Sequence, residues 1–481
     1  MKAVFSTYLT GLSTTCKQII EALSQEYEYV SLLATDSQGL SIRISQHSKN
    51  VSNKNLTTER GIVVRVYRNG RYSEAAFDDL DVRNPEAAVA RIRESLAMQD
   101  ALLSAVGSQT YETGVLEDEP RTIFVEKEAR ILPEKADVQA LVERLSALSD
   151  RGMREIEGAL DVFLSVSGTH ISKMFLTKHQ DLRQSYAYVE ATAMAYAPNA
   201  QGETKVWYDG ISGCGGLELL DGPEGLDALM DKGPRIVKEL CTAGKVVPGE
   251  YEIITTPDIS GLIAHEAFGH GVEMDMFVKH RALGAEYIDQ RVGSDLVTMH
   301  EGALCDESVT AYAFDDEGTP AGDVIEIDHG ILRTGVCDAL SALRLGIRPT
   351  GNGKREKYSH KVYTRMTNTV FEAGTDTKEA MIASVRKGYL LDGMESGMED
   401  PKHWGIQCIV SRGYEIIDGE LTGKVVSPVI MTGYVPDLLG GISMASTTCK
   451  LAGTGACGKG YKEWVKVADG GPYLKTKARL G

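Results

Sequence analysis

The N-terminal part of the chain switches repeatedly between helical and strand-like patterns of hydrophobic residues. The pattern predicts a helix near residues 15–24 and strands near 29–34 and 40–44. Two further alternating segments, 61–67 and 72–77, flank Asn69-Gly70. Because Asn-Gly tolerates the positive φ of a tight primed turn, these segments predict a β-hairpin.

Residues 84–240 continue this mixture of helices and strands. Asn84-Pro85 is typical of a helix start, and Ala88, Ile92 and Leu96 recur one turn apart after it. The remaining segments are expected to be a helix at 133–148, strands at 159–167, 172–177 and 185–196, and helical residues at 226–240 interrupted by Gly233-Pro234.

A glycine- and proline-containing stretch at 241–249 is the best candidate for a domain boundary. We therefore expect an N-terminal helix-and-sheet region at 1–245, which a linker near 117–132 can divide into two subdomains, and a C-terminal domain at 246–481. After the boundary, one short helix is followed mostly by strands and turns. Smaller helices are expected at 335–345 and 378–387.

Charge and hydropathy narrow the classes of function. The chain of 481 residues has 51 Lys and Arg against 68 Asp and Glu, a net charge of −17. Such a surface repels phosphate backbones, so direct nucleic-acid binding is not expected. The chain has no run of 18 consecutive apolar residues, so no membrane span is predicted. It has no continuous apolar stretch near Met1, so no secretory signal is predicted either. We expect a cytoplasmic protein whose eight scattered cysteines are free thiols.

One helix start leads into residues that suit a metal. Thr256-Pro257-Asp258 is typical of a helix N-terminus, and His265-Glu266 follows with His270 five residues after His265. The common zinc-peptidase motif HExxH places its histidines four apart. Five residues of α-helix rotate by about 500°, which leaves the two rings about 140° apart. A π-bulge or unwinding at Gly269 can bring them together, so we predict an irregular backbone between Glu266 and Gly271.

The residue types match metal-dependent hydrolysis. Neutral imidazoles bind Zn²⁺, a catalytic zinc needs about three protein ligands plus a water, and an adjacent glutamate can take the proton from that water. The third ligand is open at this point: the local candidates are Glu273 and Asp275, the distal ones are His300, His403 and Cys457, and proximity slightly favours Glu273. The alternative is that two histidines and a glutamate fell together by chance.

The segment 261–273, Gly-Leu-Ile-Ala-His-Glu-Ala-Phe-Gly-His-Gly-Val-Glu, resembles the HExxxH motif of the TldD/PmbA family of metallopeptidases. Other blocks agree in order, and the resemblance covers most of the chain, most densely from about 250 to 475. These blocks are Glu59–Arg65, Asp315–Pro320, Pro349–Arg355, Tyr358-Ser-His360, Arg365–Thr369, Gly455–Lys459 and Gly471-Pro472.

The resemblance implies a site with one Zn²⁺ per chain. Carried over by position, His265, His270 and Cys457 are the metal ligands and Glu266 is the general base. Glu273 then becomes a carboxylate that touches a ligand. The PmbA-like branch lacks the histidine motif, whereas this chain keeps it, so the resemblance implies a catalytic, TldD-like chain.

The resemblance also implies an α+β fold, with an N-terminal helix-and-sheet region before a β-rich metallopeptidase domain that carries the HExxxH helix. It implies a dimer, of identical chains or with an inactive PmbA-like paralogue. Peptides or unfolded polypeptides bound as extended strands are the expected substrates. Tyr358, His360 and Arg365 can polarise the scissile carbonyl or hold the peptide backbone, although a purely structural hydrogen bond is an equal alternative for each.

Two other functions remain open. The chain can be a non-catalytic regulatory or binding subunit of a protease or gyrase-modulator complex. Alternatively, the metal site can be structural, in which case a fourth protein ligand such as Glu273 is required.

Overall fold

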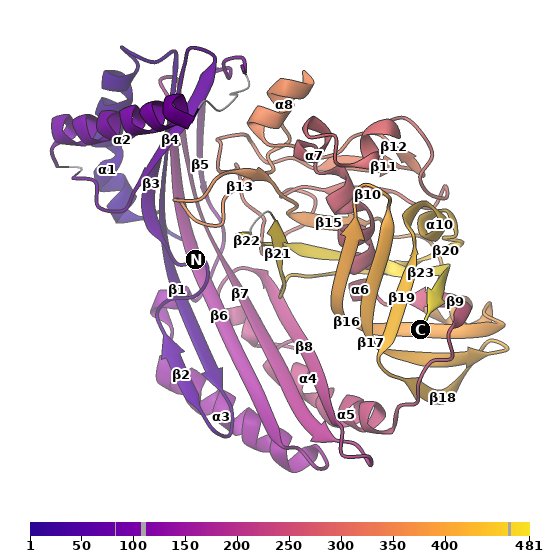
Figure 1. Cartoon of the computed structure of the whole chain (residues 1–481). Helices are drawn as coiled ribbons and strands as arrows, with labels where there is room; N and C mark the ends of the chain where they lie inside the picture. The colour runs from indigo at the N-terminus through magenta and orange to yellow at the C-terminus, as the bar shows by residue number, and fades with distance from the viewer. Residues whose placement is uncertain (82, 107–111, 460–462) are drawn as a thin grey trace.

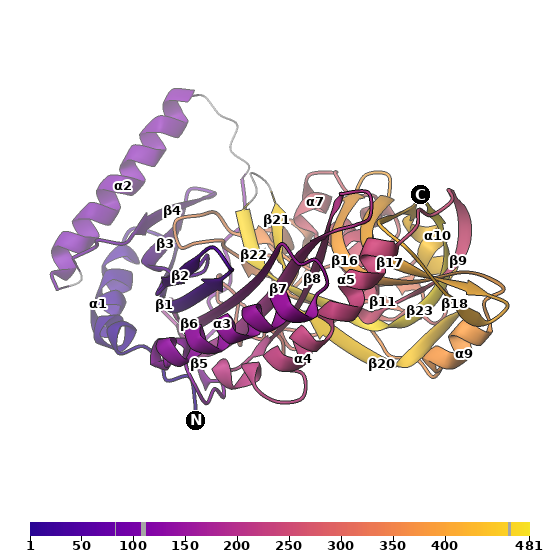
Figure 2. The same ribbon diagram turned by 90° about the horizontal axis from the view of Figure 1, so that it is seen from below.

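The computed structural model describes residues 1–81, 83–106, 112–459 and 463–481. Within these residues the strands form one eight-stranded sheet, one eleven-stranded sheet and two short two-stranded ribbons. The two large sheets and their helices lie side by side (Figure 1; Figure 2). The fold is therefore α+β, as predicted.

The first sheet uses residues from the first half of the chain. The elements of this half are α1 (Thr7–Leu23), β1 (Tyr29–Ile44), β2 (Lys49–Ser52), β3 (Arg60–Arg68), β4 (Arg71–Phe77), α2 (Pro85–Val106), β5 (Arg121–Glu126), η1 (Pro133–Lys135), α3 (Val138–Glu155), β6 (Asp161–Leu176), β7 (Gln180–Pro198), β8 (Thr204–Cys214), η2 (Leu217–Leu220), α4 (Leu226–Asp231) and α5 (Gly233–Thr242). The strand order is β4-β3-β1-β6-β7-β5, with β2 paired to β1 and β8 paired to β7.

This sheet is covered on both faces, which explains the long hydrophobic runs of its central strands. Even-numbered residues of β1, such as Leu32 and Ile42, pack under α1 and α2 at one end and under α3, α4 and α5 at the other. Because successive side chains alternate between the faces of a strand, Leu33 points the opposite way. There it packs with Phe175 and with Phe314 from the C-terminal half.

The local predictions for this half hold in part. The helix predicted at 15–24 begins eight residues earlier, as α1, and the α-helix predicted at 133–148 begins at Val138; strands β5 and β8 were not predicted. The Asn69-Gly70 hairpin is confirmed, with φ of 55° and 76° at the two turn residues. The two strands predicted at 29–34 and 40–44 are one continuous strand, β1, and those predicted at 159–167 and 172–177 are likewise one strand, β6. Between the two predicted segments of β1, the side chains of Thr35, Asp36 and Ser37 are buried, and Asp36 binds the Arg60 side chain.

The second sheet uses the rest of the chain. Its half contains β9 (Gly249–Thr255), α6 (Pro257–Leu262), η3 (Ile263–Gly269), η4 (His270–Val272), α7 (Asp275–Val278), η5 (Leu283–Glu286), β10 (Met299–Glu301), β11 (Val324–Asp328), β12 (Ile331–Leu332), α8 (Ala339–Leu345), β13 (Gly353–Lys354), β14 (Tyr363–Thr364), β15 (Asn368–Phe371), α9 (Lys378–Ala383), β16 (Lys387–Asp400), β17 (Gly405–Ile417), β18 (Glu420–Val426), β19 (Val429–Tyr434), α10 (Val435–Gly440), β20 (Met444–Ala452), β21 (Ala456–Lys459), β22 (Glu463–Lys466) and β23 (Ala468–Leu480).

Five of these strands form a closed circuit of pairings. The circuit runs β9–β16–β17–β19–β23 and returns from β23 to β9. Helix α6 and the segment η3 pack against β16 and β23, and their side chains belong to the largest hydrophobic core of the molecule. The helix that carries the two histidines is thus held on several sides by strands.

Buried ion pairs join the two halves. Arg65 on β3 binds Glu317, and Lys173 on β6 binds Asp316, so the block 315–320 of the C-terminal half is anchored on the N-terminal sheet. The first sheet ends with β8 and the second begins with β9. The domain division at 245/246, with a subdivision near 117–132, stays a prediction.

Candidate metal centre

The helix with the two histidines changes its winding in the predicted place. Thr256 occupies the N-cap position and Pro257 the first turn of α6. From Ile263 to Gly269 the chain is a π-helix, in which the His270 N–H donates to the carbonyl of His265, five residues earlier. The next residues form a short 3₁₀ turn. The predicted irregularity between Glu266 and Gly271 is therefore confirmed.

The π-helical winding brings the two imidazoles together. In a π-helix the N–H of each residue bonds to the carbonyl five residues earlier, so residues five apart lie on neighbouring turns. The ring centroids of His265 and His270 are 5.1 Å apart. An α-helix would point two histidines five residues apart in different directions, whereas the π-helix brings both rings to the same site.

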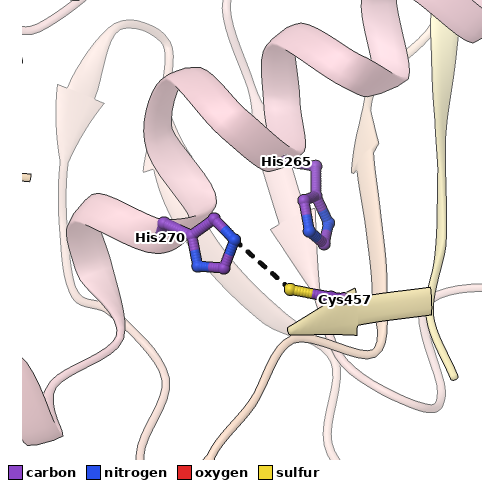
Figure 3. Close-up of side chains that lie close together, drawn as sticks. All are labelled: His265, His270 and Cys457. Atoms are coloured by element: carbon purple, nitrogen blue, oxygen red, sulfur yellow. Dashed lines mark hydrogen bonds between the residues drawn. The ribbon is translucent and has the colours of Figure 1, made fainter. Parts of the chain in front are cut away.

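A cysteine from far along the chain completes the cluster. Cys457 lies on β21, whose pairing with β22 sets Cys457 opposite Val465. Its Sγ is 3.3 Å from Nε2 of His270. One donor atom from each of His265, His270 and Cys457 lies within 4.8 Å of the others, the one such group of three or more in the described residues (Figure 3).

The three side chains influence one another's protonation. Burial alone would raise the pKa of the Cys457 thiol, but the two imidazoles outweigh burial and hold this pKa well below its usual range. Burial would lower the pKa of His265, but the Cys457 thiol outweighs it and raises the pKa to about 8. The cluster therefore favours a thiolate, which is the form of cysteine that binds metals.

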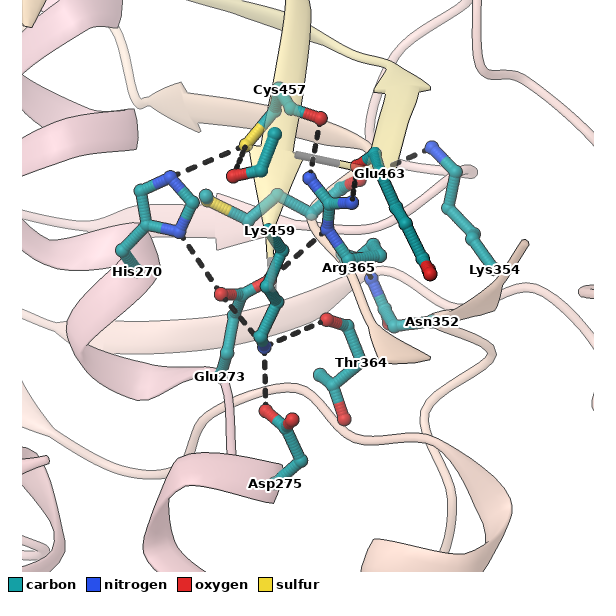
Figure 4. Close-up of polar contacts among 12 residues, drawn as sticks. His270, Glu273, Asp275, Asn352, Lys354, Thr364, Arg365, Cys457, Lys459 and Glu463 are labelled. Atoms are coloured by element: carbon teal, nitrogen blue, oxygen red, sulfur yellow. Dashed lines mark hydrogen bonds and ion pairs between the residues drawn. The ribbon is translucent and has the colours of Figure 1, made fainter. Parts of the chain in front are cut away.

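Glu273 holds His270 from behind. Its Oε2 accepts from Nδ1 of His270 at 3.0 Å, and Lys459 Nζ lies 3.0 Å from the same oxygen (Figure 4). Arg365 Nε is 3.7 Å from Glu273 Oε1. Arg365 also donates to the carbonyl of Cys457 at 2.6 Å. Glu273 thus fixes the ring on the side away from the thiol, and Arg365 ties this carboxylate to the strand that carries Cys457.

Glu266 lies next to the cluster and is half-buried. Among the described residues, its carboxylate has no hydrogen-bond or ion-pair partner. Gly397 on β16 leaves room for it, since a Cβ on Gly397 would lie 2.5 Å from Cγ of Glu266. The side chain of Glu266 therefore packs against β16, and within the described residues its carboxylate is not tied to another side chain.

The other candidate ligands are engaged elsewhere. Asp275 binds Lys279 and Lys459. His300 bonds Asp323 and Glu372, and His403 bonds Asp400.

Tyr358 and His360 do not join the cluster either. The ring of Tyr358 lies against Gly61 of β3, and the backbone N–H of Tyr358 donates to Oε2 of Glu59. His360 Nδ1 is 3.1 Å from Glu356. Arg365 is 1% exposed and lies behind Cys457. Of the three residues predicted to bind substrate, Arg365 is therefore the one with described contacts to Glu273 and to the carbonyl of Cys457.

Sequence reasoning missed the part played by Lys459. Its ammonium group bridges Glu273 and Asp275 and donates to the carbonyl of Thr364. The signal available was its position two residues after Cys457, which on a strand puts both side chains on one face. The two carboxyl oxygens of Glu399 are buried without hydrogen-bond partners, and nothing in the sequence around Glu399 indicated this burial.

The donor set fits a zinc ion. Two imidazoles and one thiolate are typical zinc ligands, and three protein ligands leave a position for water or substrate. A closed structural site needs a fourth protein ligand, but the carboxylate of Glu273 is turned to the opposite nitrogen of His270.

Within the described residues, no helix is both long and apolar enough to cross a membrane.

Comparison with known proteins points to one family. Residues 248–478 match the family model described as PmbA/TldA metallopeptidase C-terminal domain. A protein of Methanothermobacter thermautotrophicus named Metalloprotease is 25% identical over 419 residues, which are 87% of each chain. A Haemophilus influenzae protein named Metalloprotease TldD homolog is 34% identical over 216 residues, or 45% of this chain and 44% of that one, less than half of either.

The fold also has a solved counterpart. The crystal structure of TldE from Thermococcus kodakarensis superimposes with a TM-score of 0.77 over 97% of this chain and 100% of that one. The sequence identity is 18%, so this likeness concerns the fold alone.

Proposed function

The chain belongs to the PmbA/TldD family, and we propose that it is a TldD-like, zinc-dependent peptidase that hydrolyses peptides or unfolded polypeptides. The observation that carries the proposal is the cluster of His265, His270 and Cys457 with Glu266 beside it. These residues supply what a metallopeptidase needs: three ligands for one Zn²⁺ and a free carboxylate next to them.

Each residue has a separate task in the proposed reaction. His265, His270 and Cys457 hold the zinc ion. When bound, the ion supplies the Lewis acidity that polarises a carbonyl and makes water a nucleophile near neutral pH. Glu266 takes the proton from the attacking water and delivers it to the nitrogen of the leaving amine. Glu273 keeps the proton on Nδ1 of His270, so that Nε2 faces the ion.

An unpaired strand edge supports an extended peptide as substrate. β16 pairs with β17 from Lys387 to Asp400, whereas β9 pairs only with residues 388–391 on its other edge. Beyond Leu391 this edge has no partner strand among the described residues, and Gly397 within it touches Glu266. We propose that substrate adds a strand here, which gives main-chain recognition with little sequence preference.

The assembly is part of the proposal. We propose a dimer, either of identical chains or with a PmbA-like paralogue that lacks the histidine motif. Light scattering of the chain alone and of the chain mixed with such a paralogue separates the two.

The decisive experiment replaces Glu266 in the full-length chain. Glu266→Gln and Glu266→Ala are expected to keep zinc, measured by metal analysis, and to lower peptide cleavage by about 100- to 10,000-fold, the usual contribution of a general base. Glu379→Gln at an exposed position is the control. Unchanged cleavage by both Glu266 variants removes this residue from the mechanism.

The alternative of a non-catalytic regulatory subunit makes a different prediction. It expects zinc to be bound but no unstructured peptide to be cleaved, alone or with a paralogue. A peptide library assayed with the zinc-loaded wild type, with and without the paralogue, distinguishes the two functions.

A further inference from the structure

Two buried polar atoms close to the metal-site helix have no hydrogen-bond partner. One is Nδ1 of His265, and the other is Oδ1 of Asp469. Leaving a buried polar atom without a hydrogen-bond partner destabilises the folded state. Such atoms in a native structure need an explanation, and these two offer a donor and an acceptor.

Asp469 reaches the helix beside His265. It lies at the start of β23, where it is paired with Thr369 of β15 and Ala452 of β20. A Cβ on Gly261 would lie 2.5 Å from Oδ1 of Asp469. Gly261 precedes His265 by four residues, and residues four apart are neighbours on one helix face. The absence of a side chain at position 261 therefore lets the carboxyl group approach on the side where His265 is attached.

The two histidines differ in their support. Nδ1 of His270 has a carboxylate partner in Glu273, whereas Nδ1 of His265 has none. Metal-binding histidines usually donate their second ring N–H to a carboxylate or carbonyl, which fixes the tautomer and the ring. The surroundings of Asp469 agree with such a role, because its side chain is buried and His265 is a charged neighbour close enough to act on its carboxyl group.

The two atoms are not hydrogen-bonded to each other in the structure. We propose that in the zinc-loaded protein Asp469 is a positioning residue that accepts a hydrogen bond from Nδ1–H of His265 and so aims Nε2 of this ring at the metal. The proposal rests on the zinc site of the proposed function, and it is independent of peptide cleavage. The metal centre is then supported symmetrically, by Glu273 behind His270 and by Asp469 behind His265. The second carboxylate comes from a strand that follows Cys457 in the chain.

The test measures zinc affinity in full-length protein by competition with a chromogenic chelator. Asp469→Ala is expected to weaken zinc binding by about 10- to 100-fold, the usual effect of losing such a partner. Asp469→Asn, whose amide oxygen still accepts, is expected to lose less and serves as the variant that keeps the shape. The control is Asp338→Asn, which changes another buried carboxylate that caps α8.

A second readout separates positioning from general stability. The visible spectrum of the Co²⁺-substituted protein is expected to change in Asp469→Ala and to match wild type in Asp338→Asn. Wild-type zinc affinity and an unchanged Co²⁺ spectrum in both Asp469 variants, or an equal loss of affinity in the control, overturn the proposal. A wild type that binds no zinc instead overturns the proposed function, so the two failures are distinguishable.

Discussion

Glu273 and His270 form a hydrogen-bonded pair, 3.0 Å between Oε2 and Nδ1, in which the carboxylate is 1% exposed. Burial would raise the pKa of Glu273, but the charges of Lys459, His270 and Arg365 outweigh it and lower the pKa below its usual value. The carboxylate therefore stays ionised, and one buried group links a proposed metal ligand to two fixed cations.

The first prediction concerns this link. Glu273→Ala leaves Lys459 and Arg365 without their shared counter-charge, so we expect the free energy of unfolding to fall by about 3–5 kcal/mol. Glu273→Gln keeps the shape and is expected to weaken zinc binding by about 10-fold. Urea unfolding and chelator competition measure the two effects. The matched control is Asp275→Asn, because Asp275 shares Lys459 but the structure gives it no contact with His270. Equal zinc affinity in wild type and Glu273→Gln contradicts this account.

The second prediction concerns the thiol. Cys457→Ser removes a thiolate that faces both imidazoles. Loss of a residue that only hydrogen-bonds to a metal ligand lowers metal affinity by roughly 10- to 100-fold, and we expect the loss of Cys457 to lower zinc affinity further than that. Cys449→Ser, an exposed cysteine of the same half, is expected to keep full zinc content. Metal analysis after dialysis measures both. A Cys457→Ser protein that retains one zinc per chain excludes Cys457 as a ligand.

Local features of the fold were open to prediction from sequence. Asn69-Gly70 fixes its hairpin through positive φ at adjacent residues. The five-residue spacing of His265 and His270 predicted a helix distortion, because an ordinary α-helix cannot serve both rings. These inferences concern neighbours in the chain, where backbone preferences decide the outcome.

Features that depend on distant pairing were not accessible in the same way. The strand β1 runs through Asp36, which is paired on both sides with neighbouring strands and whose carboxylate binds Arg60 on one of them. Cys457 lies 187 residues after His270, and nothing near either residue marks them as neighbours. Proximity along the chain favoured Glu273 as the third ligand. The resemblance to a family indicated Cys457 instead, and pairing between strands brings it to the cluster.

The third prediction concerns close packing at the π-helix. A Cβ on Gly269 would clash with Sδ of Met366, which packs with Cys457. Gly269→Ala is therefore expected to destabilise the protein by about 1–3 kcal/mol through overpacking. Adding Met366→Ala makes room, so the double variant is expected to lose less stability than the sum of the single variants. Gly455→Ala is the control, because nothing lies within 4 Å of the position that its methyl group would occupy. Strict additivity in urea unfolding contradicts the packing explanation.

The fourth prediction concerns Glu399, whose two carboxyl oxygens are buried without partners. Burial raises its pKa to about 9; the charge of His270 opposes this rise, and Glu266 and Glu273 add to it. The folded chain then keeps a proton that the unfolded chain releases above its ordinary pKa of about 4.5. Stability is therefore expected to fall as the pH rises between these two values, by up to about 1.4 kcal/mol per pH unit. Glu399→Gln cannot ionise, so its stability relative to wild type should rise from pH 5 to pH 8. Urea unfolding of the zinc-free proteins at both pH values measures this difference, and a constant difference would show that Glu399 ionises alike in the folded and unfolded chains.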